Sequence, residues 1–230
     1  MGRLSRLGAV EVRELAVAGA IEVTPRIHRD ERGAFTEWYR FEALEAHLGH
    51  RLDLRQANLS VSRAGTVRGI HYADVPPGQA KHVTCVRGAV IDYVVDLRVG
   101  SPTFGVWDSV RLDDVERRAV YLSEGLGHCF VALEDDSTVT YLVSEVYNPS
   151  AEHGIDPLDP EVGLAFPEGL ELLLSHKDTE APSLADALAA GALPRLADVE
   201  AHLASRRAHS SMNAGGGSAM TATNAGGTHR

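Results

Sequence analysis

Short runs rich in hydrophobic and β-branched residues recur through the middle of the chain, and turn residues separate them. The separators include Pro76-Pro77-Gly78 and Gly100-Ser101-Pro102. Closely spaced strands with few helical patterns between them are typical of an all-β sandwich or barrel. The predicted strands are residues 53–62, 82–86, 89–96, 106–112, 119–122, 129–133 and 138–143.

The fold that this pattern predicts is all-β: a jelly-roll (cupin-like) antiparallel β-sandwich with short C-terminal helices. Helical periodicity is confined to residues 41–48, 184–190 and 196–207, with Ser183 and Asp198 as candidate caps. From about residue 209 onward no core-forming pattern remains, which predicts disorder. The predicted organisation is an N-terminal extension over residues 1–20, a jelly-roll domain over 21–183, a helical segment over 184–208 and a disordered tail over 209–230.

Composition and charge narrow the class of protein. A chain of 230 residues, 44% of them hydrophobic, suits one domain with one core. The formal net charge of -10 disfavours binding to nucleic acid or to an anionic membrane, so neither partner is expected. An anionic ligand would therefore need positive charge gathered locally.

The two cysteines and the N-terminus indicate the compartment. Cys85 and Cys129 each lie in an apolar stretch, which predicts buried, reduced thiols. Glu11, Arg13 and Glu14 interrupt the apolar N-terminal residues, and no apolar run reaches the ~18 residues that a spanning helix needs. These features predict a cytoplasmic protein without a signal peptide.

Side chains suited to acid–base chemistry lie in or beside the predicted strands. Arg68-Gly69-Ile70-His71-Tyr72 falls between two strand patterns, and Lys81, His128, Tyr141 and Ser175-His176-Lys177-Asp178 follow it. An isolated histidine is more often structural than catalytic. Here a base, a cation, a phenol and a carboxylate occur together, and proton abstraction beside a ketone requires such a set.

A metal-binding cupin is the alternative for two histidines in a β-sandwich. Such a site needs a second histidine two residues after His71, where the chain has Ala73, and a glutamate within a few residues, where it has Pro76-Pro77-Gly78-Gln79. Two histidines alone make a poor site for a divalent metal. We therefore expect no metal.

A series of ordered motifs runs through residues 21–183. They are Asp30-Glu31-Arg32-Gly33, Gln56-Ala57-Asn58, Arg68-Gly69-Ile70-His71-Tyr72, Pro76-Pro77-Gly78-Gln79-Ala80-Lys81, Val95-Asp96-Leu97-Arg98, Ser101-Pro102-Thr103-Phe104-Gly105 and Ser175-His176-Lys177-Asp178. In these motifs the chain resembles one known family, the dTDP-4-dehydrorhamnose 3,5-epimerases. The sequence Asp156-Pro157-Leu158-Asp159-Pro160 resembles the branch of that family that makes antibiotic deoxysugars.

The resemblance implies roles for four catalytic residues. His71 would be the proton acceptor, and Asp178 would orient its imidazole and stabilise the imidazolium. Lys81 would stabilise the enolate oxygen at C4. Tyr141 would return a proton from the opposite face of the sugar.

The resemblance also implies substrate-binding residues and a homodimer, because dimers of the family lend some of these residues across the subunit interface. Arg68, His128 and Lys177 would hold the sugar and diphosphate, Gln56 and Asn58 would meet the nucleotide, Tyr147 would stack on the thymine, and Arg32, Glu37 and Glu152 match further binding positions.

Each assignment has a structural alternative. Arg68, Lys81, Glu152 and Lys177 could be surface charges, Tyr141 a core aromatic and Tyr147 the anchor of a turn. His82, Ala57 and Cys129 depart from residues common in the family, but none of them replaces a catalytic group.

The predicted reaction inverts C3, C5 or both in a dTDP-4-keto-6-deoxy sugar. The ketone makes both hydrogens acidic, so no cofactor is required, and no Gly-x-Gly-x-x-Gly motif follows a strand. Tyr141 favours activity at C5. Two alternatives stay open: a 3,4-ketoisomerase acting on the same sugar, and a non-catalytic cupin that binds sugar nucleotides.

Overall fold

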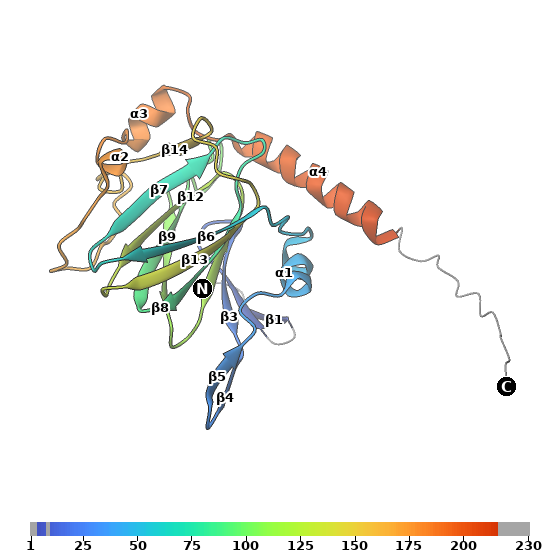
Figure 1. The fold of residues 1–230 in the computed structure, drawn as a ribbon. Coiled ribbons are helices and arrows are strands. Elements are labelled where there is room, and N and C mark those ends of the chain that lie inside the picture. Colours follow the sequence, from blue (N-terminus) through green and yellow to red (C-terminus); the bar gives the residue numbers. More distant parts are fainter. Residues whose placement is uncertain (1–3, 8–9, 216–230) are drawn as a thin grey trace, which may run out of the picture.

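Two antiparallel sheets packed face to face form the body of the protein. The computed structural model describes residues 4–7 and 10–215, and Figure 1 shows the two layers. The predicted antiparallel β-sandwich is confirmed. One sheet has the order β1 (Leu4–Leu7), β2 (Val10–Glu14), β3 (Ala20–Pro25), β11 (Ala119–Leu122), β8 (Lys81–Arg87), β13 (Ser137–Val143) and β6 (Gln56–Ser62). The other has β10 (Trp107–Asp113), β9 (Ala89–Asp96), β12 (Leu126–Ala132), β7 (Val67–Ala73) and β14 (Glu152–Gly154).

The main core lies between the sheets. Alternate side chains of each strand point inward, as in Val83 and Cys85 of β8, which pack with Val94 of β9 and Phe130 of β12. Both cysteines are buried and free, as predicted, and burial raises the pKa of the Cys85 thiol to about 11. The outer face of the five-stranded sheet is covered as well, so strands such as β9 are apolar on both faces.

The N-terminal residues extend the larger sheet rather than standing apart from it. β1 and β2 pair in sequence next to β3, so residues 4–7 and 10–14 form its edge. A separate hairpin, β4 (Ile27–Asp30) and β5 (Gly33–Thr36), projects from the body in Figure 1. Helix α1 (Phe41–Leu48) packs Leu44 against the outer face of the larger sheet and ends at Gly49, whose φ of 74° suits a glycine.

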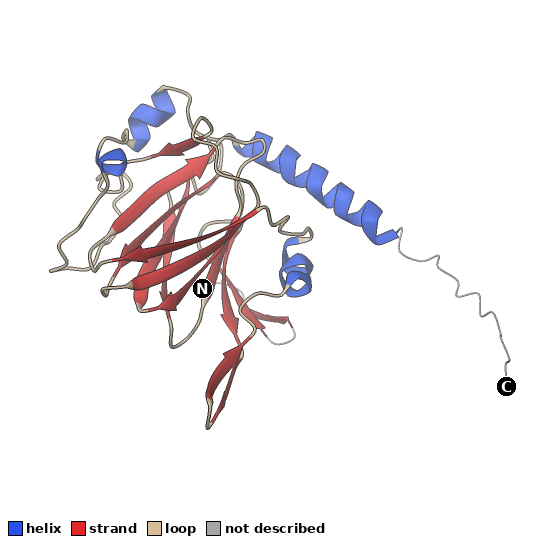
Figure 2. Cartoon of the chain, in the orientation of Figure 1, coloured by secondary structure: helices blue, strands red, loops and turns tan. Residues whose placement is uncertain are grey.

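Helices lie at the periphery, mainly near the C-terminus (Figure 2). They are α2 (His176–Thr179), α3 (Leu184–Ala189) and α4 (Leu196–Gly215). Ser183 caps α3 as predicted, accepting a hydrogen bond from the backbone N–H of Asp186. Asp198 lies inside the first turn of α4 instead of capping it. Among the described helices, none combines the length and apolar character needed to cross a membrane.

α4 extends past residue 208, the predicted end of the helical segment. α4 continues to Gly215, because adding residues to an existing helix costs less than starting one, and Ala, Ser and Met tolerate helical geometry. Residues 216–230 lie outside the described residues.

Candidate active site

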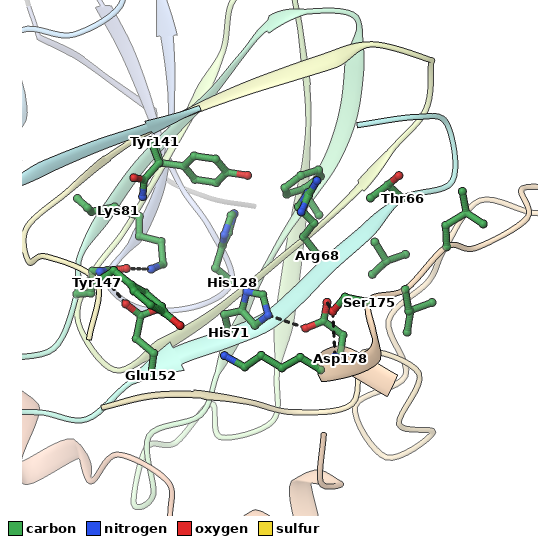
Figure 3. A pocket seen from close by; sticks show the side chains of 18 of the residues that line it. Thr66, Arg68, His71, Lys81, His128, Tyr141, Tyr147, Glu152, Ser175 and Asp178 are labelled. Carbon is green, nitrogen blue, oxygen red and sulfur yellow. Dashed lines mark hydrogen bonds and ion pairs between the residues drawn. The ribbon is translucent and has the colours of Figure 1, made fainter. Parts of the chain in front are cut away.

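A pocket of about 690 Å³ opens between the two sheets. β7 and β12 form one wall, β6, β8 and β13 form the other, and residues 173–175, 177 and 178 lie at its rim. Figure 3 shows its side chains converging on one space. Of the residues that the sequence predicts for the site, those that line this pocket are Gln56, Asn58, Arg68, His71, Lys81, His128, Tyr141, Tyr147, Glu152, Lys177 and Asp178.

A histidine–carboxylate pair stands on the β7 wall. His71 Nε2 lies 2.7 Å from Asp178 Oδ1, which leaves the other ring nitrogen, Nδ1, for a ligand. Asp178 sits in α2, and Ser175 Oγ both accepts from its backbone N–H and donates to its Oδ2 at 2.8 Å. Burial raises the pKa of Asp178, but the hydrogen bonds from His71 and Ser175 outweigh burial and lower it overall. Asp178 is therefore a carboxylate facing His71.

Backbone pairing explains how residues so far apart in sequence meet. Val67 at the start of β7 donates its N–H to the carbonyl of Leu173, and the N–H of Leu173 donates to Gly65. These bonds fix the segment just before Ser175 beside β7. Further along β7, His71 therefore lies beside Asp178 of α2.

A second histidine–carboxylate pair lies deeper in the same wall. His128 sits opposite His71 in the β12–β7 pairing, and its Nε2 lies 2.7 Å from Asp92 Oδ2. Asp92 is fully buried, which raises its pKa, while His128 opposes that shift. Sequence reasoning missed Asp92, although a carboxylate in the middle of the apolar run of β9 was a usable signal.

Lys81 provides a cation on the opposite wall. It is buried, and its Nζ donates to Gln79 Oε1, while Gln79 Nε2 donates to Glu152 Oε1 at 3.3 Å. Burial lowers the pKa of Lys81 to about 8, and the nearby charge of Glu152 opposes this. An ammonium with this pKa is mostly charged at neutral pH and can lose its proton at mildly alkaline pH. Gln79 is a second residue that sequence reasoning did not assign to the site.

Tyr141 points into the pocket from β13, between the core and the ligand space. Its ring meets His128 edge-on, with centroids 6.0 Å apart, and its hydroxyl lies 3.1 Å from Ser60 Oγ. Burial raises the pKa of Tyr141 above its ordinary value. Tyr141 is therefore a phenol with its proton in place, and it both packs against the core and lines the pocket.

Polar side chains gather where β6 meets the mouth of the pocket. Gln56 Oε1 accepts from the backbone N–H of Tyr147 at 3.0 Å, and Gln56 Nε2 donates to Asn58 at 2.6 Å. The Tyr147 side chain is 56% exposed, so its ring is available for stacking. Arg68 lines the pocket further along, with its Nε 3.2 Å from the Oγ of Ser62 at the other end of β6.

Two predicted binding residues do not line this pocket. Arg32 lies in the turn of the projecting β4–β5 hairpin and pairs with Asp30. Glu37 follows β5 and pairs with Arg40. In their own chain, neither the Arg32 guanidinium nor the Glu37 carboxylate lines the pocket.

The described residues do not form a typical metal site. Among residues 4–7 and 10–215, no three His, Cys, Asp or Glu side chains group as metal ligands. The expectation of a metal-free reaction stays a prediction.

Comparison with known proteins agrees with the resemblance. The sequence model described as dTDP-4-dehydrorhamnose 3,5-epimerase matches residues 14–186. The chain belongs to this family. A Mycolicibacterium smegmatis relative named dTDP-4-dehydrorhamnose 3,5-epimerase is 57% identical over 195 residues, covering 85% of this chain and 96% of the relative.

Solved structures extend the family match to the fold. A Mycobacterium tuberculosis epimerase has a TM-score of 0.83 and 52% identity, covering 85% of this chain and 98% of that one. ChmJ, a 3'-monoepimerase from Streptomyces bikiniensis in complex with dTDP-quinovose, has the same TM-score and 46% identity, covering 84% and 98%. Relatives named for one and for two inverted carbons thus share this fold.

Proposed function

We propose that the protein epimerises a dTDP-4-keto-6-deoxy sugar at C3, at C5 or at both. The hydrogens on these carbons flank the C4 ketone, so removing either one gives an enolate. Returning a proton to the other face inverts the carbon. This chemistry needs a base on one side of the sugar and an acid on the other.

The observation that carries the proposal is that His71 and Tyr141 come from opposite sheets and face one pocket. His71 lies on β7 of the five-stranded sheet, and Tyr141 lies on β13 of the seven-stranded sheet. In Figure 3 their side chains stand on different sides of the central space. A sugar ring held between the sheets would present one face to each residue. His71 would take the proton, with Asp178 stabilising the imidazolium, and Tyr141 would return one.

Lys81 supports this assignment by its position and charge. It stands in the same pocket as a buried ammonium, where a developing enolate oxygen would gain more from a fixed cation than it would in water. Gln79 holds the ammonium in place. Neither a metal nor a nicotinamide is required for these steps.

Binding of the nucleotide is assigned to the mouth of the pocket. The chain carries a formal charge of -10, yet Arg63, Arg68, Lys81 and Lys177 all line this pocket. Such a local concentration of positive charge suits a diphosphate. Gln56 and Asn58 are placed to contact the base, and Tyr147 is placed to stack on it. His128 and Glu152 complete the sugar site.

We further propose a homodimer. Leu59 and Val61 of β6 and Val86 of β8 are 63%, 54% and 39% exposed on the outer face of the larger sheet. Apolar groups gathered on an open sheet face favour association. A dimer would also give Arg32, in the turn of the projecting hairpin, and Glu37, at the base of that hairpin, a partner's pocket to enter. Light scattering should report a dimer, and a monomer would contradict this assignment.

Incubation with dTDP-4-keto-6-deoxyglucose in D₂O tests the proposed function. NMR should show deuterium and inversion at C3, C5 or both, and the position identifies the epimerised carbon. A product with its carbonyl at C3 would instead show a 3,4-ketoisomerase. Binding of dTDP with no exchange at either carbon would indicate a non-catalytic sugar-nucleotide protein.

A further inference from the structure

The inner face of β6 carries four polar residues at every second position: Gln56, Asn58, Ser60 and Ser62. Side chains two apart on a strand share one face, and Gln56 and Asn58 line the pocket. Ser60 and Ser62 continue the same row deeper into the sandwich. Neither serine lines the pocket, but each forms a hydrogen bond with a residue that does. Ser60 bonds to Tyr141, and Ser62 bonds to Arg68.

We propose that Ser60 is a positioning residue for the proton donor: it holds the Tyr141 hydroxyl toward the sugar and stabilises the charge left on Tyr141 after proton transfer. This inference rests on the proposed role of Tyr141 as the donor.

The surroundings of Tyr141 make its hydrogen bond to Ser60 important. The ring contacts His128 and Phe130, with centroids 6.0 and 6.4 Å away, and it packs against the apolar core. Ser60 Oγ, at 3.1 Å, is the hydrogen-bond partner that the described residues give to its hydroxyl. A phenolate formed here without Ser60 would face aromatic edges and aliphatic groups, which stabilise negative charge poorly.

Charged neighbours act on Tyr141 in both directions. The carboxylate of the buried Asp92 disfavours a phenolate, and Arg68 favours it. Burial is the largest influence and also disfavours the charged form. Ser60 is the neutral group in direct contact with the reacting oxygen, and its hydrogen bond opposes the effect of burial.

The proton-transfer step shows why a hydroxyl suits this position. The Tyr141 O–H bond breaks as its proton joins the carbon beside the ketone, and the enolate electrons form the new C–H bond while the carbonyl is restored. The negative charge passes to the Tyr141 oxygen, which water later protonates. A serine hydroxyl can donate to the Tyr141 oxygen, which leaves the Tyr141 proton free to point at the carbon before transfer and stabilises the phenolate afterwards.

Ser62 offers a matched control on the same face of the same strand. Its Oγ accepts a hydrogen bond from Arg68 Nε at 3.2 Å, whereas the hydroxyl of Ser60 is bonded to Tyr141. Removing this hydroxyl should loosen a residue assigned to the diphosphate. The variant Ser62→Ala should therefore weaken dTDP binding and change the ratio of inversion to uptake much less than Ser60→Ala does.

The experiment compares wild type, Ser60→Ala, Ser60→Thr, Ser62→Ala and Tyr141→Phe on dTDP-4-keto-6-deoxyglucose in D₂O. NMR measures deuterium uptake and inversion separately, and calorimetry with dTDP verifies that each variant binds. In Ser60→Ala we expect uptake to persist while inversion falls about 10- to 100-fold, the effect of losing a hydrogen bond to a charged group. Ser60→Thr keeps the hydroxyl on a strand-compatible side chain and should restore inversion.

The outcomes separate this inference from the proposed function. Two results would overturn the positioning role alone. One is a wild-type ratio of inversion to uptake in Ser60→Ala. The other is that Ser60→Ala and Ser60→Thr each lose uptake and inversion to the same extent. A wild-type ratio in Tyr141→Phe would show that Tyr141 is not the donor, and it would overturn the roles of Tyr141 and Ser60 while the proposed epimerisation stands. A wild type that neither exchanges nor inverts would overturn the proposed function itself.

Discussion

The pairing of Asp178 with His71 predicts a specific loss when Asp178 is replaced by Asn. The substitution keeps the shape of the side chain but removes the charge that faces the imidazolium formed on proton abstraction. Nε2 and Oδ1 are 2.7 Å apart, and the Asp178 side chain is only 6% exposed. Asp178→Asn should therefore slow abstraction while leaving the nucleotide site intact.

The size of the loss follows from the geometry. Unit charges about 4 Å apart interact by about 4 kcal/mol at the effective dielectric of a protein surface. The His71 side chain is 35% exposed, so solvent weakens this interaction. We expect a loss of about 2–3 kcal/mol, in line with hydrogen bonds to charged groups. That loss corresponds to a rate about 30- to 150-fold lower.

The assay is the rate of deuterium uptake at C3 and C5, measured by NMR with saturating substrate. His176→Ala is the matched control, because His176 is exposed on the same short helix and does not line the pocket. It should exchange at close to the wild-type rate. An Asp178→Asn variant within about twofold of wild type would refute the reasoning that the carboxylate stabilises the imidazolium.

Three further predictions concern the donor, the cation and the absence of a metal. Tyr141→Phe should keep deuterium uptake but lose inversion, more at C5 than at C3, and wild-type inversion by NMR would make Tyr141 a packing residue. Because burial lowers the pKa of Lys81 to about 8, turnover should fall as pH rises through that value, and Lys81→Arg should move the fall to higher pH. A pH–rate profile with no fall there would contradict this. Turnover should survive EDTA, whereas loss restored by one divalent ion would reveal a metal requirement.

Much of the sandwich could be predicted from local sequence. The bounds of β9 and β11 coincide with the predicted residues 89–96 and 119–122, because buried strands of this kind are almost uniformly apolar. β7 was missed: Arg68 and His71 face the pocket and Gly69 has no side chain, so the residues that build the site conceal the strand pattern. β1 and β2 were missed because they form the edge of the sheet and carry charged residues.

The site could be predicted as a list of residues but not as a network of partners. His71 and Asp178 meet across 107 positions, and His128 and Asp92 across 36, so only the folded sheets bring them together. Ser60 and Gln79 gave no separate signal, since serine and glutamine are ordinary residues of a strand face or a turn. Arg32 and Glu37 lie outside the pocket of their own chain, where they pair with Asp30 and Arg40.

The central claim is that one base, His71, removes the protons on both sides of the ketone. The most direct measurement is deuterium uptake at C3 and C5 by His71→Ala, with dTDP affinity measured in parallel by calorimetry. The account predicts that uptake disappears at both carbons while dTDP binds nearly as it does to wild type. Substantial uptake at C3 in a variant that binds dTDP normally would show that another residue is the base.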